Sequence, residues 1–297
     1  MQNIIKNLKK SSVKTIAKQG GKTKHLLITG DSSEVLKKIS DESIDLIFTD
    51  PPYNMDIPYG KTYKDSLPWK KYYLQAENWF SEYNRVLKKT GSIYIMNYPE
   101  VNARILPFLE DKLGLKLQRW ITWHYPTNIG HSNKNFTRSQ RSILFLTKTD
   151  KYTFNRDKIL QLYENPDVGK VRQLIKKGRK GRGAYDFLTK TDFIDMEMTN
   201  SKKDLFDSFY IDLLKNVSPD RLKTRTKNKV KSLHPCQLPF ELIKRFIEVS
   251  TDPGDIVLDP FAGTFSTSAV ANQLNRNSIG IEISPKYIRL GLSRLKN

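Results

Sequence analysis

The chain has 297 residues, which is enough for one large α/β domain with an inserted module. Its 51 lysines and arginines against 31 aspartates and glutamates give a net charge of +20. This excess favours a polyanionic partner, because each neutralised phosphate releases counterions, although a lysine-rich solvated surface would look the same. A single cysteine, Cys236, excludes an internal disulfide and a cysteine-based zinc site, and the four histidines lack metal-ligand spacing, so no metal is expected.

The first half of the chain predicts alternating strands and helices. Residues 1–24 carry lysines and no acid, and we expect a flexible basic arm there, without the apolar segment of a secretory signal. Short β-prone runs predict strands at 25–29, 44–48, 92–96, 120–123 and 142–147, and apolar residues at helical spacing predict helices at 32–39 and 70–88. Because no apolar run approaches the roughly 18 residues that span a bilayer, we expect a cytoplasmic protein without membrane contact.

The second half contains an interruption and then a regular segment. Between about 150 and 232 the periodicity weakens, and two basic runs occur at 170–182 and 221–231, which indicates an inserted module between residues 25–149 and 233–297. A helix at 239–249, strands at 255–259 and 278–283, a helix at 266–275 and a last helix after Pro285 follow. Strands alternating with helices predict a doubly wound, mostly parallel sheet, in which loops at the carboxyl ends of the strands line one crevice.

The first candidate site follows the nearly continuous apolar strand at 44–48. It reads Asp50-Pro51-Pro52-Tyr53. An exocyclic amine of a nucleobase is a poor nucleophile because its lone pair is conjugated with the ring. The Asp50 carboxylate and the Pro51 carbonyl can accept its two N–H groups and favour a more nucleophilic geometry, while Tyr53 offers a ring on which a base can stack. The alternative is a proline turn after a buried strand.

The second candidate site follows the strand at 255–258. It reads Asp259-Pro260-Phe261-Ala262-Gly263-Thr264 and precedes a helix. Gly263 allows a ligand to approach the backbone closely, and the helix amino terminus follows. Glu282 ends the next strand about twenty residues later, a spacing suited to hydrogen bonds with ribose hydroxyls. A structural turn and a surface acid are the alternatives.

These motifs together carry a resemblance to a known family. The loop at 50–53 resembles the catalytic loop of amino-group DNA methyltransferases, and the loop at 259–264 resembles their S-adenosyl-L-methionine (AdoMet) loop. Residues 234–239, His-Pro-Cys-Gln-Leu-Pro, resemble the His-Pro-x-Gln-x-Pro signature of the same enzymes. The catalytic motif comes first, which is the circularly permuted order of the β group. The resemblance implies a Rossmann-like, seven-stranded class I methyltransferase fold, AdoMet as cofactor, and a target recognition module at 150–232.

The resemblance also implies roles for individual residues. The catalytic residues would be Asp50, Pro51, Pro52 and Tyr53. The AdoMet site would comprise Asp31, Asp50, His234, Gln237, Pro239, Asp259, Pro260, Phe261, Gly263, Thr264, Ser266, Thr267 and Glu282. The two basic runs would contact DNA through Lys176, Lys177, Arg179, Lys180, Arg182, Arg221 and Arg225. One position departs from the family pattern Phe-x-Gly-x-Gly, because Phe265 replaces the last glycine; we expect its side chain to point away from the cofactor.

The resemblance predicts methyl transfer to the N6 amine of an adenine flipped out of double-stranded DNA. Aspartate in the first position of the catalytic loop is typical of adenine enzymes of this group, and serine of cytosine-N4 enzymes. A cytosine-N4 enzyme and a catalytically impaired DNA-binding paralogue are the alternatives. Cys236 as a cytosine-C5 nucleophile is rejected, because those enzymes need no Asp-Pro-Pro-Tyr loop. A cognate restriction endonuclease and association into a homodimer stay open.

Overall fold

The computed structural model describes residues 4–5, 12–17, 23–56, 65–125, 134, 136–159, 161–162, 185–186, 202–203, 208–211, 220–225, 230–234 and 236–296. The chain divides into two compact units, one formed by residues 1–154 and 207–297 and the other by residues 155–206. Among the described residues, no helix has the length and apolar character needed to cross a membrane.

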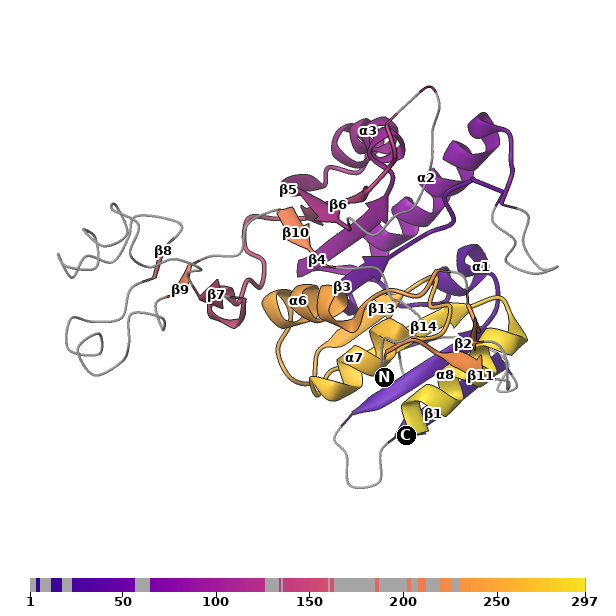
Figure 1. Ribbon diagram of the computed structural model, residues 1–297. Coiled ribbons are helices and arrows are strands. Elements are labelled where there is room, and N and C mark those ends of the chain that lie inside the picture. Colours follow the sequence, from indigo (N-terminus) through magenta and orange to yellow (C-terminus); the bar gives the residue numbers. More distant parts are fainter. Residues whose placement is uncertain are drawn as a thin grey trace, which may run out of the picture. The chain divides into compact units, whose positions relative to one another are not determined.

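The first unit is built on one large sheet (Figure 1). Within the described residues it has nine strands, in the order β1-β2-β14-β13-β3-β4-β6-β5-β10. All neighbours pair in parallel except β1 with β2 and β6 with both of its neighbours. The predicted mostly parallel sheet is therefore confirmed, with β1 and β10 added at the two edges of the expected seven strands. The strands are β1 Val13–Ala17, β2 Lys24–Thr29, β3 Ile44–Thr49, β4 Leu87–Asn97, β5 Lys116–His124, β6 Gln140–Thr147, β10 Ser208–Tyr210, β13 Ile256–Asp259 and β14 Asn277–Glu282.

The edge strand β1 corrects one expectation. Residues 1–24 were expected to form a flexible arm, but Val13–Ala17 pairs antiparallel with β2, with Val13 opposite Ile28. Ile5 forms a β-bridge with Ile39, and the side chains of Ile4, Ile5 and Val13 pack against the core. The arm prediction is wrong for these residues because β2 offers unpaired backbone groups at the sheet edge, and a short apolar–polar alternation satisfies them despite the basic composition.

Helices cover both faces of the sheet (Figure 1). They are α1 Ser32–Leu36, α2 Trp69–Val86, α3 Pro99–Pro107, α6 Phe240–Ser250, α7 Ser266–Gln273 and α8 Pro285–Lys296, with a π-helical turn at Phe108–Lys112 and a 3-10 turn at Arg156–Lys158. Alternate residues of β2 separate the two layers, because Leu26 and Ile28 join the core cluster with Trp79 of α2, whereas Leu27 packs with Ile288 of α8. This doubly wound arrangement fits the strand–helix alternation of the sequence.

Short strands occur outside the large sheet. β11 Lys223–Arg225 and β12 Val230–Ser232 form an antiparallel hairpin in the first unit. In the second unit, β7 Gln161–Leu162, β9 Lys202–Lys203 and β8 Tyr185–Asp186 form a three-stranded sheet. The compact unit at 155–206 is thus shorter than the module expected at 150–232, and its role in target recognition stays a prediction.

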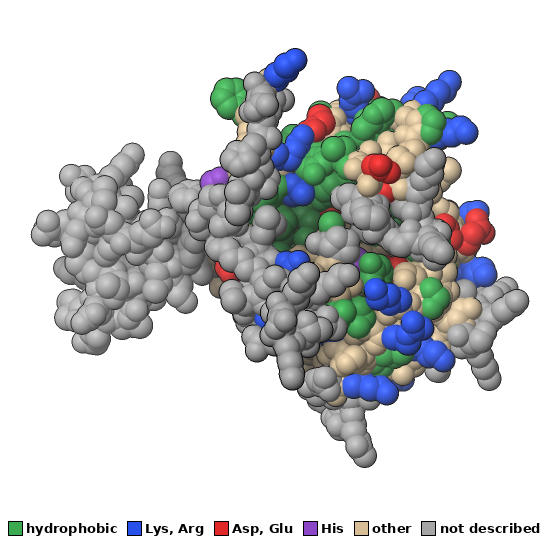
Figure 2. Space-filling model, turned by 45° about the vertical axis from the view of Figure 1, so that its right-hand side comes forward, with side chains coloured by type: hydrophobic (Ala, Val, Ile, Leu, Met, Phe, Trp, Pro, Cys, Tyr) green, Lys and Arg blue, Asp and Glu red, His purple; other side chains and the backbone are tan. Residues whose placement is uncertain are grey.

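The positive charge of the described surface is distributed. Figure 2 shows lysine and arginine side chains at several places on the face turned to the reader. Some of them pair with acids, such as Lys116 with Asp150 at 2.6 Å and Arg245 with Glu241 at 2.6 Å. Exposed pairs of this kind contribute little to stability. Because cations outnumber acids in the chain, many of them are left without an acidic partner and can attract a polyanion.

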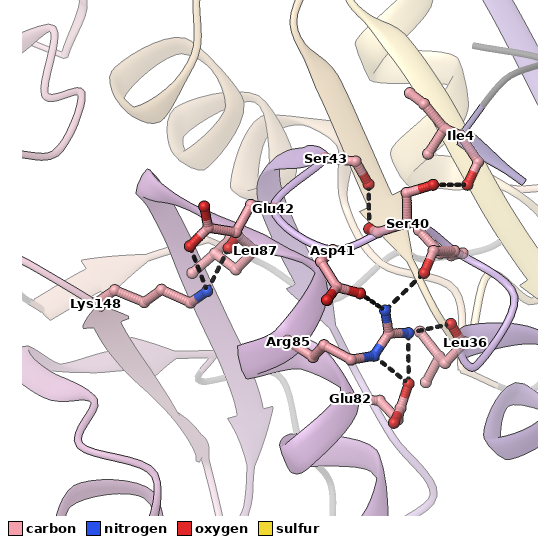
Figure 3. Close-up of polar contacts among 11 residues, drawn as sticks. Ile4, Leu36, Ser40, Asp41, Glu42, Ser43, Glu82, Arg85, Leu87 and Lys148 are labelled. Atoms are coloured by element: carbon pink, nitrogen blue, oxygen red, sulfur yellow. Dashed lines mark hydrogen bonds and ion pairs between the residues drawn. The ribbon is translucent and has the colours of Figure 1, made fainter.

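A polar network closes the amino ends of β3 and β4 (Figure 3). Arg85, at the last turn of α2, donates to the backbone carbonyls of Leu36 and Ile39, each at 2.8 Å. The same guanidinium pairs with Glu82 at 2.7 Å and with Asp41 at 2.5 Å. One planar cation therefore joins α2 to the end of α1 and the chain that follows it, and its hydrogen bond to Leu36 adds to the one that this carbonyl accepts from the backbone N–H of Ile39.

Candidate functional site

A pocket opens at the opposite end of the sheet, where β2, β3, β13 and β14 end. It is lined by residues far apart in sequence, which the parallel strands bring to one edge. The predicted residues in its wall are Asp31, Asp50, Pro52, His234, Gln237, Asp259, Pro260, Phe261, Gly263, Thr264, Ser266, Thr267 and Glu282. Residues that the sequence reasoning missed also line it: Ser32, Gln75, Trp79, Cys236, Leu238, Ala262, Ile281, Ile283 and Tyr287. Pro239 is buried and caps α6 instead.

Asp259 organises the 259–264 loop. Its carboxylate accepts hydrogen bonds from the Thr267 hydroxyl at 2.6 Å and from the backbone N–H of Phe261 at 3.1 Å. Burial raises the pKa of the Asp259 carboxyl to about 7. The Ser32 hydroxyl, at the start of α1, donates to the carbonyl of Pro260, so α1 and the loop are joined at the pocket.

Glu282 lies at the end of β14 and faces the same loop. Its carboxylate accepts from the backbone N–H of Gly263 at 2.9 Å and of Ser284 at 2.7 Å, and burial raises its pKa to about 7. Gly263 has φ +50°, and a Cβ added to it would lie 3.2 Å from the His234 ring. Glycine therefore suits this position both by conformation and by space.

Phe265 points away from the pocket, as expected. Phe265 is the N-cap residue of α7 and has φ 61°. Its side chain is fully buried and does not line the pocket. The ring fills a niche beside two glycines: an added Cβ would lie 2.5 Å from the ring at Gly280 and 2.2 Å from it at Gly291. The bulky residue is accommodated because these positions lack side chains, and the prediction for its orientation is confirmed.

The 234–239 segment connects the pocket to the β11–β12 hairpin. His234 stacks edge-on with Tyr287 at 4.5 Å, and burial lowers the pKa of its imidazole to about 4. The Gln237 side chain accepts from the backbone N–H of Leu222 at 2.9 Å and donates to the carbonyl of the same residue at 3.0 Å. Gln237 therefore anchors the segment that carries the half-buried Arg221, and its expected contact with the cofactor carboxylate stays a prediction.

The catalytic loop lies where β3 ends. The Tyr53 hydroxyl donates to the Asp50 carboxylate at 2.6 Å, and the Tyr72 hydroxyl donates to the carbonyl of Pro52 at 2.9 Å. Burial raises the pKa of the Asp50 carboxyl to about 6, and the hydrogen bond from Tyr53 and the charge of Arg141 oppose that rise. Pro51 is buried next to Asp50. The Asp50 carboxylate therefore lies between the pocket and the Tyr53 ring.

Aromatic residues and an arginine surround Tyr53. The Tyr98 ring, just after β4, meets the Tyr53 ring edge-on at 4.9 Å. The guanidinium carbon of Arg141, in β6, lies 5.4 Å from the centre of the Tyr53 ring. Sequence reasoning did not identify Arg141 as part of the site.

The structure describes only some of the residues predicted to contact DNA, and their contacts stay a prediction. Lys176, Lys177, Arg179, Lys180 and Arg182 lie outside the described residues. Arg225 lies in β11 and Arg221 just before it, close to the segment that Gln237 anchors. Across the described ranges, no cluster of three or more His, Cys, Asp or Glu side chains is placed to hold a metal ion.

Comparisons with known proteins agree on one family. A family model described as "DNA methylase" matches residues 44–293, a range that includes both motif loops. The "Type II methyltransferase M.HpaI" of Haemophilus parainfluenzae is 33% identical over 269 residues, covering 91% of this chain and 73% of that protein. The "DNA adenine methyltransferase YhdJ" of Escherichia coli K12 is 36% identical over 276 residues, covering 91% of this chain and 82% of that protein.

Solved structures share the fold. The structure titled "PVUII DNA methyltransferase (cytosine-N4-specific)" superposes with a TM-score of 0.62 at 18% identity, covering 91% of this chain and 86% of the other. The "M1.HpyAVI-SAM complex" superposes with a TM-score of 0.57 at 19% identity, covering 91% and 98% of the two chains. At these identities the likeness concerns the path of the backbone.

Proposed function

The chain belongs to the N6/N4 family of DNA methylases, which are AdoMet-dependent DNA methyltransferases, and we propose that it methylates the N6 amine of an adenine flipped out of DNA. The observation that carries the proposal is the position of Asp50. Its side chain lines the pocket formed with the 259–264 loop and also accepts the hydrogen bond of Tyr53. An acceptor so placed can bind the amine of a base that stacks on Tyr53.

The pocket residues fit AdoMet, which carries a positive sulfonium, two ribose hydroxyls and an adenine. Three of the acids in the pocket wall are Asp31, Asp259 and Glu282, and carboxylates attract a cation and accept from hydroxyls. Gly263 lines the pocket just before the amino end of α7. Glu282 already accepts two backbone N–H groups, which fixes its carboxylate while each oxygen retains capacity for a ribose hydroxyl.

The chain's own residues polarise and position the amine. When bound, AdoMet supplies an electrophilic methyl group. The Asp50 carboxylate and the Pro51 carbonyl accept the two N–H groups of the amine, so that its lone pair is freed from conjugation and directed toward the methyl group. Tyr53 holds the base by stacking, and burial of the loop keeps water away. The ionised Asp50 carboxylate is the stronger acceptor, so methyl transfer should slow as the pH falls below the Asp50 pKa of about 6.

Adenine is favoured over cytosine by two observations. Asp50 is the residue typical of the adenine-specific members of the group, and the 36% identical relative from Escherichia coli is a DNA adenine methyltransferase by name. Cytosine N4 is the second candidate, because its amine would meet the same acceptors.

Expression in a host that lacks DNA methylation tests the proposal. Sequencing of the host DNA should detect N6-methyladenine within one short sequence, and the Asp50→Ala variant should leave the DNA unmodified. N4-methylcytosine instead would overturn the choice of base. Unmodified DNA together with AdoMet binding measured by calorimetry would indicate the impaired paralogue.

We also propose the cellular location of the enzyme, a partner enzyme and its oligomeric state. DNA and AdoMet are available inside the cell, which supports a cytoplasmic enzyme. The relative from Haemophilus parainfluenzae is a Type II methyltransferase, which supports a companion restriction endonuclease. Protection of the methylated DNA from a nuclease in an extract of the source cells tests that partner, and sedimentation of the purified protein tests the homodimer.

Target recognition by residues 150–232 is supported by the basic runs at 170–182 and 221–231. Neutralising Lys176, Lys177, Arg179 and Lys180 together should weaken duplex binding and reduce the salt dependence by roughly 0.9 for each lost phosphate contact. AdoMet affinity should stay the same. An unaltered salt slope would show that the run is only a solvated surface.

A further inference from the structure

Arg141 is a cation enclosed by aromatic rings next to the catalytic loop. Its guanidinium carbon lies 4.4 Å from the centre of the Tyr98 ring, 5.2 Å from that of Tyr125 and 5.4 Å from that of Tyr53. A planar guanidinium stacks on such rings much as a nucleobase does. Tyr53 is only 6% exposed, and Arg141 and Tyr98 are among the groups that cover it. A base that enters this site therefore meets Arg141 directly.

One edge of the Arg141 guanidinium is unused. Its Nη1 donates to the Tyr125 hydroxyl and, at 3.3 Å, to the backbone carbonyl of Gln140. Among the described residues, its Nε and Nη2 groups have no hydrogen-bond partner, and Arg141 takes part in no ion pair. Nε and Nη2 form the parallel fork that matches two oxygens of a phosphate or carboxylate. The geometry thus presents an anion-binding edge beside Tyr53.

Arg138, three residues earlier, shows the contrasting case. Its guanidinium carbon lies 3.9 Å from the centre of the Tyr98 ring, so both arginines use the same ring. The fork of Arg138 is occupied by Glu100, with nitrogen–oxygen distances of 3.0 and 2.5 Å. The chain therefore supplies an anion for Arg138 and leaves the neighbouring fork of Arg141 to a ligand.

We propose that Arg141 binds the phosphate group of the flipped-out nucleotide whose base stacks on Tyr53. The inference rests on the proposed function, because that function brings a nucleotide to Tyr53. The base and the phosphate of one nucleotide are joined through a single sugar, so a base on Tyr53 places a phosphate within reach of the neighbouring fork. Tyr98 and Tyr125 hold the guanidinium in place before DNA arrives, which reduces the entropy lost on binding.

The test compares Arg141→Gln and Arg141→Lys with Arg138→Gln, a matched control in the same segment. The probe is a short duplex that carries the sequence found methylated in the host DNA, and binding is measured by fluorescence anisotropy over a range of salt. Arg141→Gln should bind roughly tenfold or more weakly, with a log–log salt slope reduced by about 0.9. Arg141→Lys, which keeps the charge and loses the fork, should lie between, and Arg138→Gln should keep the wild-type slope. AdoMet affinity, measured by calorimetry, should be the same in all four proteins and checks their folding.

A second arm identifies the phosphate. Replacing a phosphate that flanks the target nucleotide with a neutral methylphosphonate should weaken wild-type binding and leave Arg141→Gln unaffected, because the contact is already lost. An unchanged salt slope in Arg141→Gln overturns the inference, and so does equal weakening of both proteins by the methylphosphonate, which would assign Arg141 to the base or to the fold. If the methylated base in that sequence is cytosine, modified at N4, the proposed adenine specificity is overturned and the inference still stands, because a flipped cytosine carries the same phosphate.

Discussion

Charged side chains at the two ends of the central sheet differ in their partners. At the amino end, the half-buried Arg85 has two acids and two backbone carbonyls as partners, so its charge is neutralised. At the carboxyl end, the carboxyls of Asp50, Asp259 and Glu282 accept hydrogen bonds from neutral groups, and burial raises their pKa values to about 6, 7 and 7. The first end stabilises the fold, and the second keeps acids ready for a ligand.

The raised pKa values have a consequence for stability. A carboxyl whose pKa is about 7 when folded, and near 4 when unfolded, binds more protons in the folded chain between these values. These carboxyls therefore lower the free energy of unfolding as pH rises from about 4 to about 7, whereas the His234 imidazole, whose pKa is about 4 in the folded chain, raises it over part of the same range. A cationic ligand that binds the ionised carboxylates would offset this loss of stability. AdoMet, which carries a positive sulfonium, is a ligand of this kind.

The largest expected effect concerns Phe265 and separates the stability of the fold from ligand binding. Phe265 belongs to the loop at the carboxyl end but packs into the core, so Phe265→Ala should lower the free energy of unfolding by about 3–5 kcal/mol with little change in AdoMet affinity. Chemical denaturation and calorimetry measure the two quantities. Phe265→Gly should be more stable than Phe265→Ala by about 1 kcal/mol, because φ of 61° favours glycine.

The glycine opposite Phe265 provides the control. Gly291→Ala should destabilise the wild-type protein, because the added Cβ would meet the ring, and should be harmless or favourable in the Phe265→Ala protein. A clear loss of AdoMet affinity in Phe265→Ala would show that the ring shapes the pocket after all.

The next effect isolates chemistry at the carboxyl end. Asp50→Ala should reduce methyl transfer by on the order of 100-fold or more, because the amine loses its acceptor. The unfolding free energy at pH 7.5 should stay the same or rise, since a buried carboxylate with a raised pKa is removed. Turnover within a few-fold of wild type would contradict the assigned role.

The amino end should respond in the opposite sense. Arg85→Met should lower the free energy of unfolding by about 2–3 kcal/mol, because the carbonyls of Leu36 and Ile39 each lose a hydrogen bond and two ion pairs are removed. The kcat of the folded fraction and the AdoMet affinity should not change. Lys37→Met, which removes only an exposed pair with Glu34, is the control and should have almost no effect. A reduced kcat in Arg85→Met would show that the two ends are coupled.

Local patterns predicted much of this molecule. Apolar strands followed by proline or glycine loops located Asp50 and Asp259, and parallel pairing of β3 with β13 then placed both at one edge. Arg141 and Tyr98 could not be found in the same way. They meet because β6 runs antiparallel to β4, with Asn97 opposite Ser142, and no local pattern specifies that pairing.

Two other features depend on remote contacts. The basic composition of residues 1–24 predicts a flexible arm, because the short strand β1 within it is stable only when it pairs with β2. Phe265 has a left-handed backbone conformation, and its ring occupies space that is free because Gly280 and Gly291, later in the chain, have no side chains. Sequence suggested the direction of the side chain, and the structure supplies the space that allows it.

The smallest expected effect concerns the hydroxyl of Tyr53. Stacking needs only the ring, so Tyr53→Phe should methylate DNA at close to the wild-type rate at pH 8. The hydroxyl donates to Asp50 and helps to keep its pKa low, so its loss should move the acid limb of kcat above the wild-type position near pH 6.

The other charged groups near Asp50 are unchanged in this variant. They are Arg141, which also lowers the pKa of Asp50, and Asp259, which opposes ionisation of Asp50. Tyr94→Phe is the matched control, because it removes another buried tyrosine hydrogen bond, to Ser250 at 2.8 Å, away from Asp50. Its acid limb should coincide with that of the wild type, and an unmoved limb in Tyr53→Phe would mean that the hydroxyl does not tune the catalytic carboxylate.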